Sequence, residues 1–289
     1  MGTCRVPLFR RSSAERVADS LLLRSSGTQW EVTPIPNQCN SCVRYLDLTL
    51  STPAENLALD EALLEEAEAA GCPQETMRVW EFDRPVVVVG RSSRVQREVH
   101  GDACRELEIP VLRRISGGGA VVAGPGCLMY SLVLSYRRRP ALRSLDHAHC
   151  IVLGTLAAAL TPLAPGLQPR GTCDLAVGER KVSGNSVRAK REHLLYHGTL
   201  LYDFPLELIG RCLAMPPREP AYRGSRPHEA FVANLTADAA TIRRALQTAW
   251  EAVETCGDWP AALTARLAAQ RYGRREWNEQ FVEDVAGGP

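Results

Sequence analysis

Apolar and polar residues alternate along the chain in patterns that predict a mixed α and β fold. The segment YLDLTL, residues 45–50, has the two-residue period of a strand, and NLALDEALLEEAEAA, residues 56–70, places its leucines on a helical period. Two strand-like runs follow, MRVWEF at 77–82 and PVVVVG at 85–90, separated by the turn signal DRP. The unbroken valines of the second run predict a strand that is buried on both faces.

The rest of the chain continues this alternation up to Pro205 and is mainly helical in pattern afterwards. We expect a helix returning to a strand over 101–114, a glycine-rich turn and one long strand over 116–136, a helix over 147–163, and strands joined by loops over 173–188 and 193–203. Helical patterns then cover 205–215, 236–255 and 260–272. No internal repeat or low-complexity tract interrupts this order.

Composition and charge exclude several classes of partner. The 289 residues are 45% hydrophobic and 23% charged, and the net charge of +1 provides no basic field for nucleic acid or anionic lipid. No apolar run reaches the roughly 18 residues of a membrane span. Ten cysteines lack the spacing of a secreted scaffold, and the CxxC of Cys39 and Cys42 has no second pair to complete a zinc site. We therefore expect a soluble, cytoplasmic protein with no metal site of its own.

Lys181 stands out because 34 basic residues include only one other lysine, Lys190. It lies in GERKVSGNS, residues 178–186, where small, hydroxyl and amide side chains can present donors to phosphate or carboxylate oxygens. An ammonium on a flexible stem can follow a negative charge that moves during a reaction, whereas a guanidinium locks into a planar fork. This lysine loop is the strongest candidate for chemistry.

Three further segments are each open to a structural or a functional reading. Gly117–Gly119 lack the spacing of the common nucleotide loops, so they predict either an unusual turn or a place where a ligand lies against backbone. His197, in the sequence His-Gly-Thr, is more often a hydrogen-bonded structural histidine than a base. Arg91 follows the valine run, where it can meet a carboxylate or phosphate or form a rim salt bridge.

Taken in order, GRSSRVQREV, RRISGGGAV, DLAVGERKVSGNS, HGTLL, RPHEAFVANL and REWN resemble the lipoate-protein ligase A group of the biotinyl/lipoyl protein ligase catalytic superfamily. The resemblance covers most of residues 45–280 and implies that family's α/β (α+β) fold, with mixed sheets flanked by helices. The Arg- and Ser-containing, weakly periodic residues 1–44 predict a flexible N-terminal extension, followed by a catalytic domain over 45–240 and a short helical tail over 241–289.

The resemblance further implies an activity and a set of site residues. Lipoate or octanoate would be activated with ATP and Mg²⁺ as an acyl-adenylate, and the acyl group passed to a lysine of a lipoyl domain of a 2-oxoacid dehydrogenase complex or of the glycine cleavage H protein. Lys181 would be catalytic, contacting the acyl carboxyl and the α-phosphate. The other residues that the resemblance places around substrate and adenylate are Arg91, Arg114, Ser116, Gly117, Gly118, Gly119, Asp174, Ser183, Gly184, Asn185, Ser186, His197, Gly198 and Thr199.

Departures from the family pattern keep two alternatives open. Where many ligases of the group have histidine, aspartate and asparagine, this chain has Ala123, Gly124 and Cys127, and only about 50 residues follow the catalytic region. The first alternative is an acyl-carrier-dependent octanoyl or lipoyl transferase that uses a cysteine thioester, with Cys173 as the candidate nucleophile. The second is a non-catalytic acyl-binding subunit; an accessory chain that completes the site is also compatible with the sequence.

Overall fold

The computed structural model describes residues 21–26, 29–34, 43–254 and 258–280, and the chain divides into two compact units, Met1–Ser41 and Cys42–Pro289. In the first unit, β1 (Leu21–Ser26) and β2 (Gln29–Pro34) form an antiparallel hairpin in a segment whose weak periodicity predicts no element. Cys39 and Cys42 lie outside the described residues. All further elements belong to the second unit.

An eight-stranded sheet forms the centre of the second unit, with the strand order β13-β3-β4-β8-β12-β11-β10-β9. The strands β13, β3 and β4 run parallel to one another and the other neighbours are antiparallel, so the sheet is mixed. Its strands are β3 (Val43–Asp47), β4 (Thr76–Trp80), β8 (Cys127–Ser135), β9 (Leu167–Arg170), β10 (Asp174–Val177), β11 (Arg180–Ala189), β12 (His193–Leu201) and β13 (Ala252–Glu254).

A second, three-stranded sheet contains the valine run. Its order is β6-β5-β7, with β5 at Val86–Val89, β6 at Val111–Arg113 and β7 at Val121–Ala123. All four residues of β5 are buried, which confirms the prediction of a strand covered on both faces.

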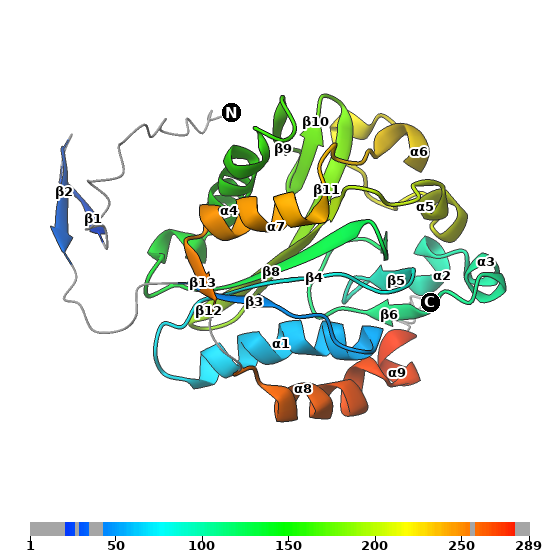
Figure 1. The fold of residues 1–289 in the computed structure, drawn as a ribbon, viewed down its shortest axis with the longest axis horizontal. Helices are drawn as coiled ribbons and strands as arrows, with labels where there is room; N and C mark the ends of the chain where they lie inside the picture. Colours follow the sequence, from blue (N-terminus) through cyan, green and yellow to red (C-terminus); the bar gives the residue numbers. More distant parts are fainter. Residues whose placement is uncertain (1–20, 27–28, 35–42, 255–257, 281–289) are drawn as a thin grey trace, which may run out of the picture. The chain divides into compact units, whose positions relative to one another are not determined.

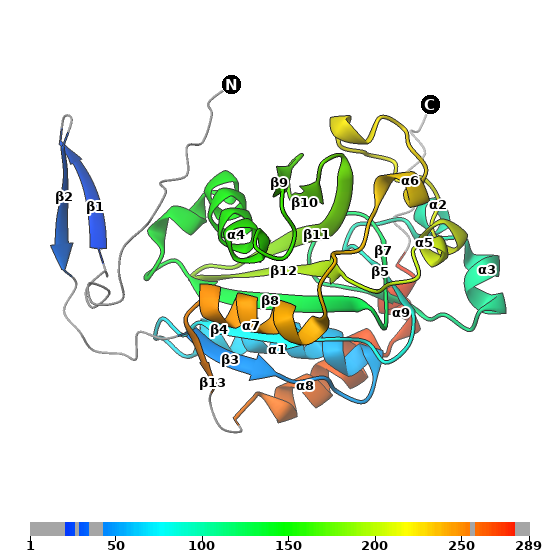
Figure 2. The same ribbon diagram turned by 45° about the horizontal axis from the view of Figure 1, so that its top comes forward.

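Helices cover both faces of the large sheet. Figures 1 and 2 show α1 (Pro53–Ala69) and α8 (Ala261–Leu267) on one face, and α4 (Leu145–Leu160) and α7 (Ala239–Ala249) on the other. Each face has its own cluster of buried apolar side chains, so the sheet separates two cores. The shorter helices α2 (Val95–Glu98), α3 (Gly101–Glu106), α5 (Glu207–Cys212) and α6 (His228–Phe231) lie around the small sheet at one end of the unit, and α9 (Arg275–Asn278) packs against β6.

The start of α1 follows from its first residues. The Thr52 hydroxyl accepts a hydrogen bond from the Glu55 backbone N–H, and the Glu55 carboxylate accepts one from the Thr52 N–H. This capping box satisfies two backbone donors that the first turn leaves without helical partners, and Pro53 occupies the position where a missing N–H costs nothing. The helix therefore has a fixed origin from which it carries Asp60 to the site.

Three expectations from the sequence pattern need correction. The long strand expected over 116–136 is two strands, β7 and β8, because the chain turns at Gly126, whose φ of +88° belongs to the left-handed region. The expected lysine loop is a strand, since Lys181 is the second residue of β11. The residues after 240 are more than a helical tail, because β13 joins the large sheet beside β3 and α8 packs against α1.

The predicted fold class is confirmed. Mixed sheets flanked by helices make up the second unit, as the interleaved strand and helix patterns indicate. No helix in the described part of the chain has the length and apolar character needed to cross a bilayer.

Candidate active site

A cavity of about 240 Å³ lies beside the strands β10, β11 and β12, the glycine turn and the helices α5 and α6. Apolar side chains form much of its wall: Leu57, Val88, Val121, Val122, Met129, Leu201, Ile209, Leu213, Phe231 and Val232. Polar residues form the rest, including Asp60, Glu98, Arg114, Asp174, Lys181, Ser183, Asn185, Ser186, His197 and Thr199. An apolar cavity with a small set of convergent polar groups is the usual form of a small-molecule site.

Lys181 and Asp174 form an ion pair in this cavity, with 2.7 Å between Nζ and Oδ1. A β-bulge between β10 and β11 creates the pair: Leu175 faces Ser183, but Ala176 faces Lys181, so one residue of β11 has no opposite partner. Because side chains alternate between the faces of a sheet, the extra residue moves Lys181 onto the face that carries Asp174. The bulge thus aims the ammonium at the carboxylate.

Gly184 provides the space for the lysine stem. A Cβ atom at this position would lie 2.8 Å from Nζ and 2.9 Å from Cε of Lys181. The side chain therefore crosses directly over the glycine on its way to Asp174. The small residue in VSGNS is explained by this close approach.

Asp174 has a second partner, which the sequence reasoning missed. The Tyr222 hydroxyl donates to Oδ2 with 2.9 Å between the two oxygens. Burial, and then the negative charge of Asp174, raise the pKa of Tyr222, so the phenol keeps its proton and acts as a donor. No local pattern in the sequence connects residues 174 and 222.

Arg114 builds the glycine turn. Its guanidinium donates to the carbonyl oxygens of Gly117, Gly119 and Val88 and to the Ser116 hydroxyl. Burial lowers the pKa of Arg114 to about 10, which still leaves it charged at neutral pH. Its donors are directed at the turn, so the structure gives Arg114 a supporting position beside the cavity.

The turn is also fixed from β11, because the Ser186 hydroxyl donates to the Gly117 carbonyl at 2.9 Å. Gly118 has a φ of +85°, and a Cβ on the neighbouring Gly90 would lie 1.9 Å from the Gly118 carbonyl oxygen. Glycine is therefore needed here both for conformation and for close backbone packing. Gly118 and Gly119 line the cavity, whereas Gly117 contributes through its carbonyl.

A buried chain of polar groups joins the turn to α1. Ser116 Oγ lies 2.6 Å from His197 Nε2, and His197 Nδ1 lies 3.3 Å from Asp60 Oδ2. Burial alone would raise the pKa of Asp60, but hydrogen bonding to His197 and the charge of Arg78, 2.7 Å away, lower it below its ordinary value. Since an ionised carboxylate only accepts hydrogen bonds, Nδ1 donates to Asp60, and in the neutral imidazole Nε2 then accepts from the Ser116 hydroxyl. His197 is thus held from both sides, and it lines the cavity.

The remaining predicted residues divide into two groups. Asn185 donates to the Cys173 carbonyl at 2.8 Å, and Ser183, Gly198 and Thr199 line the cavity with it. Arg91 does not line the cavity; its side chain is exposed and only its backbone N–H, which donates to the Ser116 carbonyl, supports the turn. The binding roles of these residues stay predictions.

Neither Cys173 nor Cys127 has a thiol whose pKa is lowered. Cys173 lines the wall, but burial and the nearby Asp174 raise the pKa of its thiol. Cys127 is buried in β8, where burial raises the pKa of its thiol to about 12. A Cβ at Gly124 would lie 3.0 Å from Cα of Pro85, a tight contact with backbone.

Two cavity carboxylates were missed by the sequence reasoning. Asp60 sits among the leucines of α1, and a charged residue on an apolar helix face could have signalled a buried polar network. Glu98, from α2, accepts a hydrogen bond from the Ala120 N–H at 2.8 Å. Among the described residues, no cluster of three or more histidine, cysteine, aspartate or glutamate side chains could hold a metal ion.

Several known proteins are similar to this chain over about two thirds of its length or more. A protein of Aeropyrum pernix provisionally named lipoate-protein ligase A is 34% identical over 179 residues, covering 62% of this chain and 64% of its own length. Lipoate–protein ligase 1 of Staphylococcus aureus is 28% identical, covering 64% of this chain and 54% of its own. The octanoyltransferase LipM of Geobacillus kaustophilus is 25% identical, covering 81% and 97%. The chain thus spans less than two thirds of the length of these ligases.

Solved structures share the fold. A bi-partite lipoate protein ligase of Thermoplasma acidophilum, studied with its E2 lipoyl domain, gives a TM-score of 0.69 at 22% identity and covers 84% of this chain and 99% of its own. A lipoate-protein ligase A bound with ATP gives 0.67 at 22% identity, covering 82% and 98%. The profile described as "Lipoyl protein ligase A/B catalytic domain" matches residues 52–249, which contain the whole cavity wall, and the chain therefore belongs to this family.

Proposed function

We propose that this protein activates lipoate or octanoate with ATP and transfers the acyl group to a lysine of a lipoyl-carrier domain. The observation that carries the proposal is the Lys181–Asp174 pair in a cavity whose wall is otherwise rich in apolar side chains. The apolar wall suits a medium-length acyl chain, and the ammonium suits the carboxylate at its end. The chain's membership of the lipoyl protein ligase A/B family, together with its similarity to named ligases, supports the same conclusion.

The first step would join the acid to the nucleotide. A carboxylate oxygen attacks the α-phosphorus, the new O–P bond forms, and pyrophosphate leaves with the electrons of the broken P–O bond. Lys181 would neutralise the negative charge that grows at the α-phosphate. To do so, its ammonium has to exchange Asp174 for the substrate, which its flexible stem permits.

The second step would transfer the acyl group. The amine nitrogen of the carrier lysine attacks the acyl carbon, the C–O bond to AMP breaks, and the nitrogen loses a proton. Lys181 would again stabilise charge, now on the departing AMP. Magnesium would be held mainly by the phosphates, as is usual for this ion, with Asp174 as the carboxylate of the cavity that could contribute a ligand.

The carrier would be a lipoyl domain of a 2-oxoacid dehydrogenase complex or the glycine cleavage H protein. A Thermoplasma ligase that shares this fold is described with its E2 lipoyl domain and as bi-partite. By analogy with that bi-partite ligase, a separate accessory chain is part of the proposal as a second component.

A cysteine-dependent acyltransferase is the second candidate. It is favoured by the position of Cys173 in the cavity wall, by the absence of polar groups at residues 123, 124 and 127, and by similarity to an octanoyltransferase. In that reaction the Cys173 sulfur would take the acyl group from a carrier thioester and pass it to the lysine amine. The raised pKa of the Cys173 thiol disfavours it, because the thiolate is the attacking species.

Exchange of labelled pyrophosphate into ATP, dependent on lipoate or octanoate, tests the proposal. Wild-type protein should catalyse the exchange, and Lys181→Ala should lower the rate about 10²- to 10³-fold, as expected when one group that stabilises transition-state charge is removed. Lys190→Ala is the matched control, because Lys190 pairs with Glu65 and does not line the cavity. Exchange that is absent from the wild type, or unaffected by Lys181→Ala, would contradict the proposal.

A further inference from the structure

Asp174 is held by two side chains from different segments, and only one of them has a place in the proposed reaction. Lys181 contacts Oδ1 from β11, and Tyr222 donates to Oδ2 from the segment between α5 and α6. The Asp174 side chain is only 9% exposed. A carboxylate this well buried is costly to leave without partners.

Tyr222 is firmly placed for this contact. The Tyr222 ring packs on Phe231, with 5.1 Å between the ring centroids. The guanidinium of Arg170, the last residue of β9, lies 5.3 Å from the Tyr222 centroid. The ring also approaches the backbone at Gly171. These contacts fix the ring while the hydroxyl alone reaches Asp174, so the hydroxyl can be removed without removing the packing.

The proposed chemistry requires Lys181 to leave Asp174 for the substrate. When it leaves, the carboxylate loses its ammonium partner inside the protein. We propose that Tyr222 is a positioning residue, whose hydroxyl holds the Asp174 carboxylate in place and keeps it hydrogen-bonded while Lys181 moves to the substrate. This inference rests on the proposed function and extends it to a residue outside the cavity wall.

A consequence concerns the segment that carries Tyr222. Its neighbours Pro216, Arg218, Pro220 and Arg223 belong to the cavity wall. The hydroxyl therefore ties this part of the wall to β10 at the carboxylate that Lys181 must leave. Release of the lysine is linked to correct placement of the wall.

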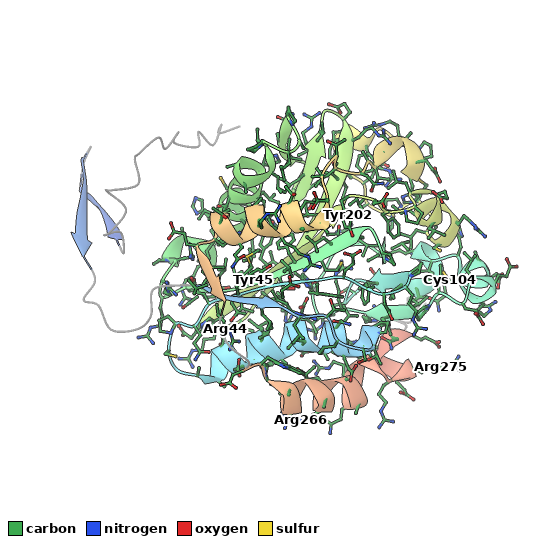
Figure 3. The ribbon with its side chains drawn as sticks, in the orientation of Figure 1. Arg44, Tyr45, Cys104, Tyr202, Arg266 and Arg275 are labelled. Atoms are coloured by element: carbon green, nitrogen blue, oxygen red, sulfur yellow. The ribbon has the colours of Figure 1, made fainter. Side chains whose placement is uncertain are left out.

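Tyr222→Phe tests the effect of the tyrosine hydroxyl on the reaction rate. The rate of pyrophosphate exchange at saturating acid should fall about tenfold, because one hydrogen bond to a charged group is lost. The KM for octanoate should change less than about twofold, since Tyr222 does not line the cavity, and the ring packing should preserve the melting temperature. Tyr202→Phe is the matched control: its hydroxyl also donates to a carboxylate, Glu81, at 2.9 Å, and Tyr202, labelled in Figure 3 just after β12, does not line the cavity.

A double-mutant cycle with Asp174→Asn separates positioning from packing. In the Asp174→Asn background Lys181 is no longer held by charge, so adding Tyr222→Phe should lower the rate less than about twofold further. If the tyrosine were purely structural, Tyr222→Phe would lower the exchange rate by the same factor with Asp174 and with Asn at that position. That result would overturn the inference.

The two lysines allow a test that needs no catalysis. With lysine labelled at Cε and Nζ, the NMR spectrum contains one signal from Lys181 and one from Lys190. Tyr222→Phe should shift the Lys181 signal and leave that of Lys190 unchanged, whereas Tyr202→Phe should move neither. An unmoved Lys181 signal overturns the inference even if exchange activity is present. Absent exchange in the wild type would overturn the proposed function, and the NMR result would still decide the contact.

Discussion

At the scale of single residues, position 181 explains why this arginine-rich chain uses a lysine. The stem of Lys181 passes within contact distance of Gly184 and ends 2.7 Å from Asp174. A planar guanidinium is wider than an ammonium, so an arginine at this position would need more room beside Gly184. We therefore expect that space, as well as charge, favours lysine at this position.

Gly184→Ala tests that explanation. The new Cβ would push the Lys181 ammonium away from Asp174, and misplacement by about 1 Å should lower exchange activity about 10²-fold. The melting temperature should stay near that of the wild type, because the displaced group is the end of a flexible side chain. Full activity in Gly184→Ala would show that the path of the lysine is not important.

Gly198→Ala provides the contrast. Its Cβ would lie 1.9 Å from Oδ1 of Asn185 and 2.8 Å from the carbonyl oxygen of Gly184, so backbone has to move. The expected loss of unfolding free energy is about 1 to 3 kcal/mol, seen as a lower melting temperature.

Sequence reasoning at this scale found the residues that share a short stretch. Lys181, Asp174 and Gly184 lie within one hairpin and could be recognised together. Asp60, Glu98 and Tyr222 were missed because their contacts join distant segments, such as Asp60 with His197 and Tyr222 with Asp174. Arg91 was placed by its position after a strand, but strand position alone does not determine where a side chain points.

At the scale of elements, α1 connects the core to the site. Asp60 on this helix accepts from Ser131 and His197 and pairs with Arg78, which is fully buried in β4. Because His197 supports Ser116 and the glycine turn, the helix fixes a part of the cavity wall that lies far away in the sequence.

Asp60→Asn should destabilise the protein by about 3 to 5 kcal/mol at neutral pH, because it leaves the Arg78 guanidinium buried without its counter-charge. The pKa of Asp60 is lowered in the folded protein, so its stabilising contribution is present above about pH 4 and is lost as the pH falls through the folded pKa. The variant should therefore show a shallower loss of unfolding free energy between about pH 5 and pH 3, measured by urea unfolding.

Asp47→Asn is the control for this experiment, since Asp47 pairs with Arg243 at an exposed position. This substitution should lower the free energy of unfolding by less than about 1 kcal/mol. Equal pH dependence in Asp60→Asn and the wild type would contradict the assigned role of Asp60.

The bulge shows the limit of prediction at this scale. Hydrophobic periods located α1, the buried valine strand and the strands around Lys181. They could not show that one extra residue between β10 and β11 turns Lys181 toward Asp174, because the mismatch exists only once the two strands pair. The sequence therefore indicated a loop where the structure has a strand.

At the scale of the whole molecule, one sheet separates two cores and brings residues 60, 174, 181 and 197 to one cavity. The fold class followed from the order of elements, and the family resemblance is confirmed over residues 52–249. The choice between ligase and transferase did not follow, since the sequence is similar to relatives of both kinds.

Intact-mass measurement of an apo lipoyl domain tests the central claim most directly. The purified protein is incubated with the domain and either lipoate with MgATP or octanoyl-acyl carrier protein without ATP. We predict the mass gain of one lipoyl group in the first arm, dependent on ATP and lost in Lys181→Ala. A gain only in the second arm, lost in Cys173→Ser, would contradict the account and assign the chemistry to the thiol; no gain in either arm would contradict it as well.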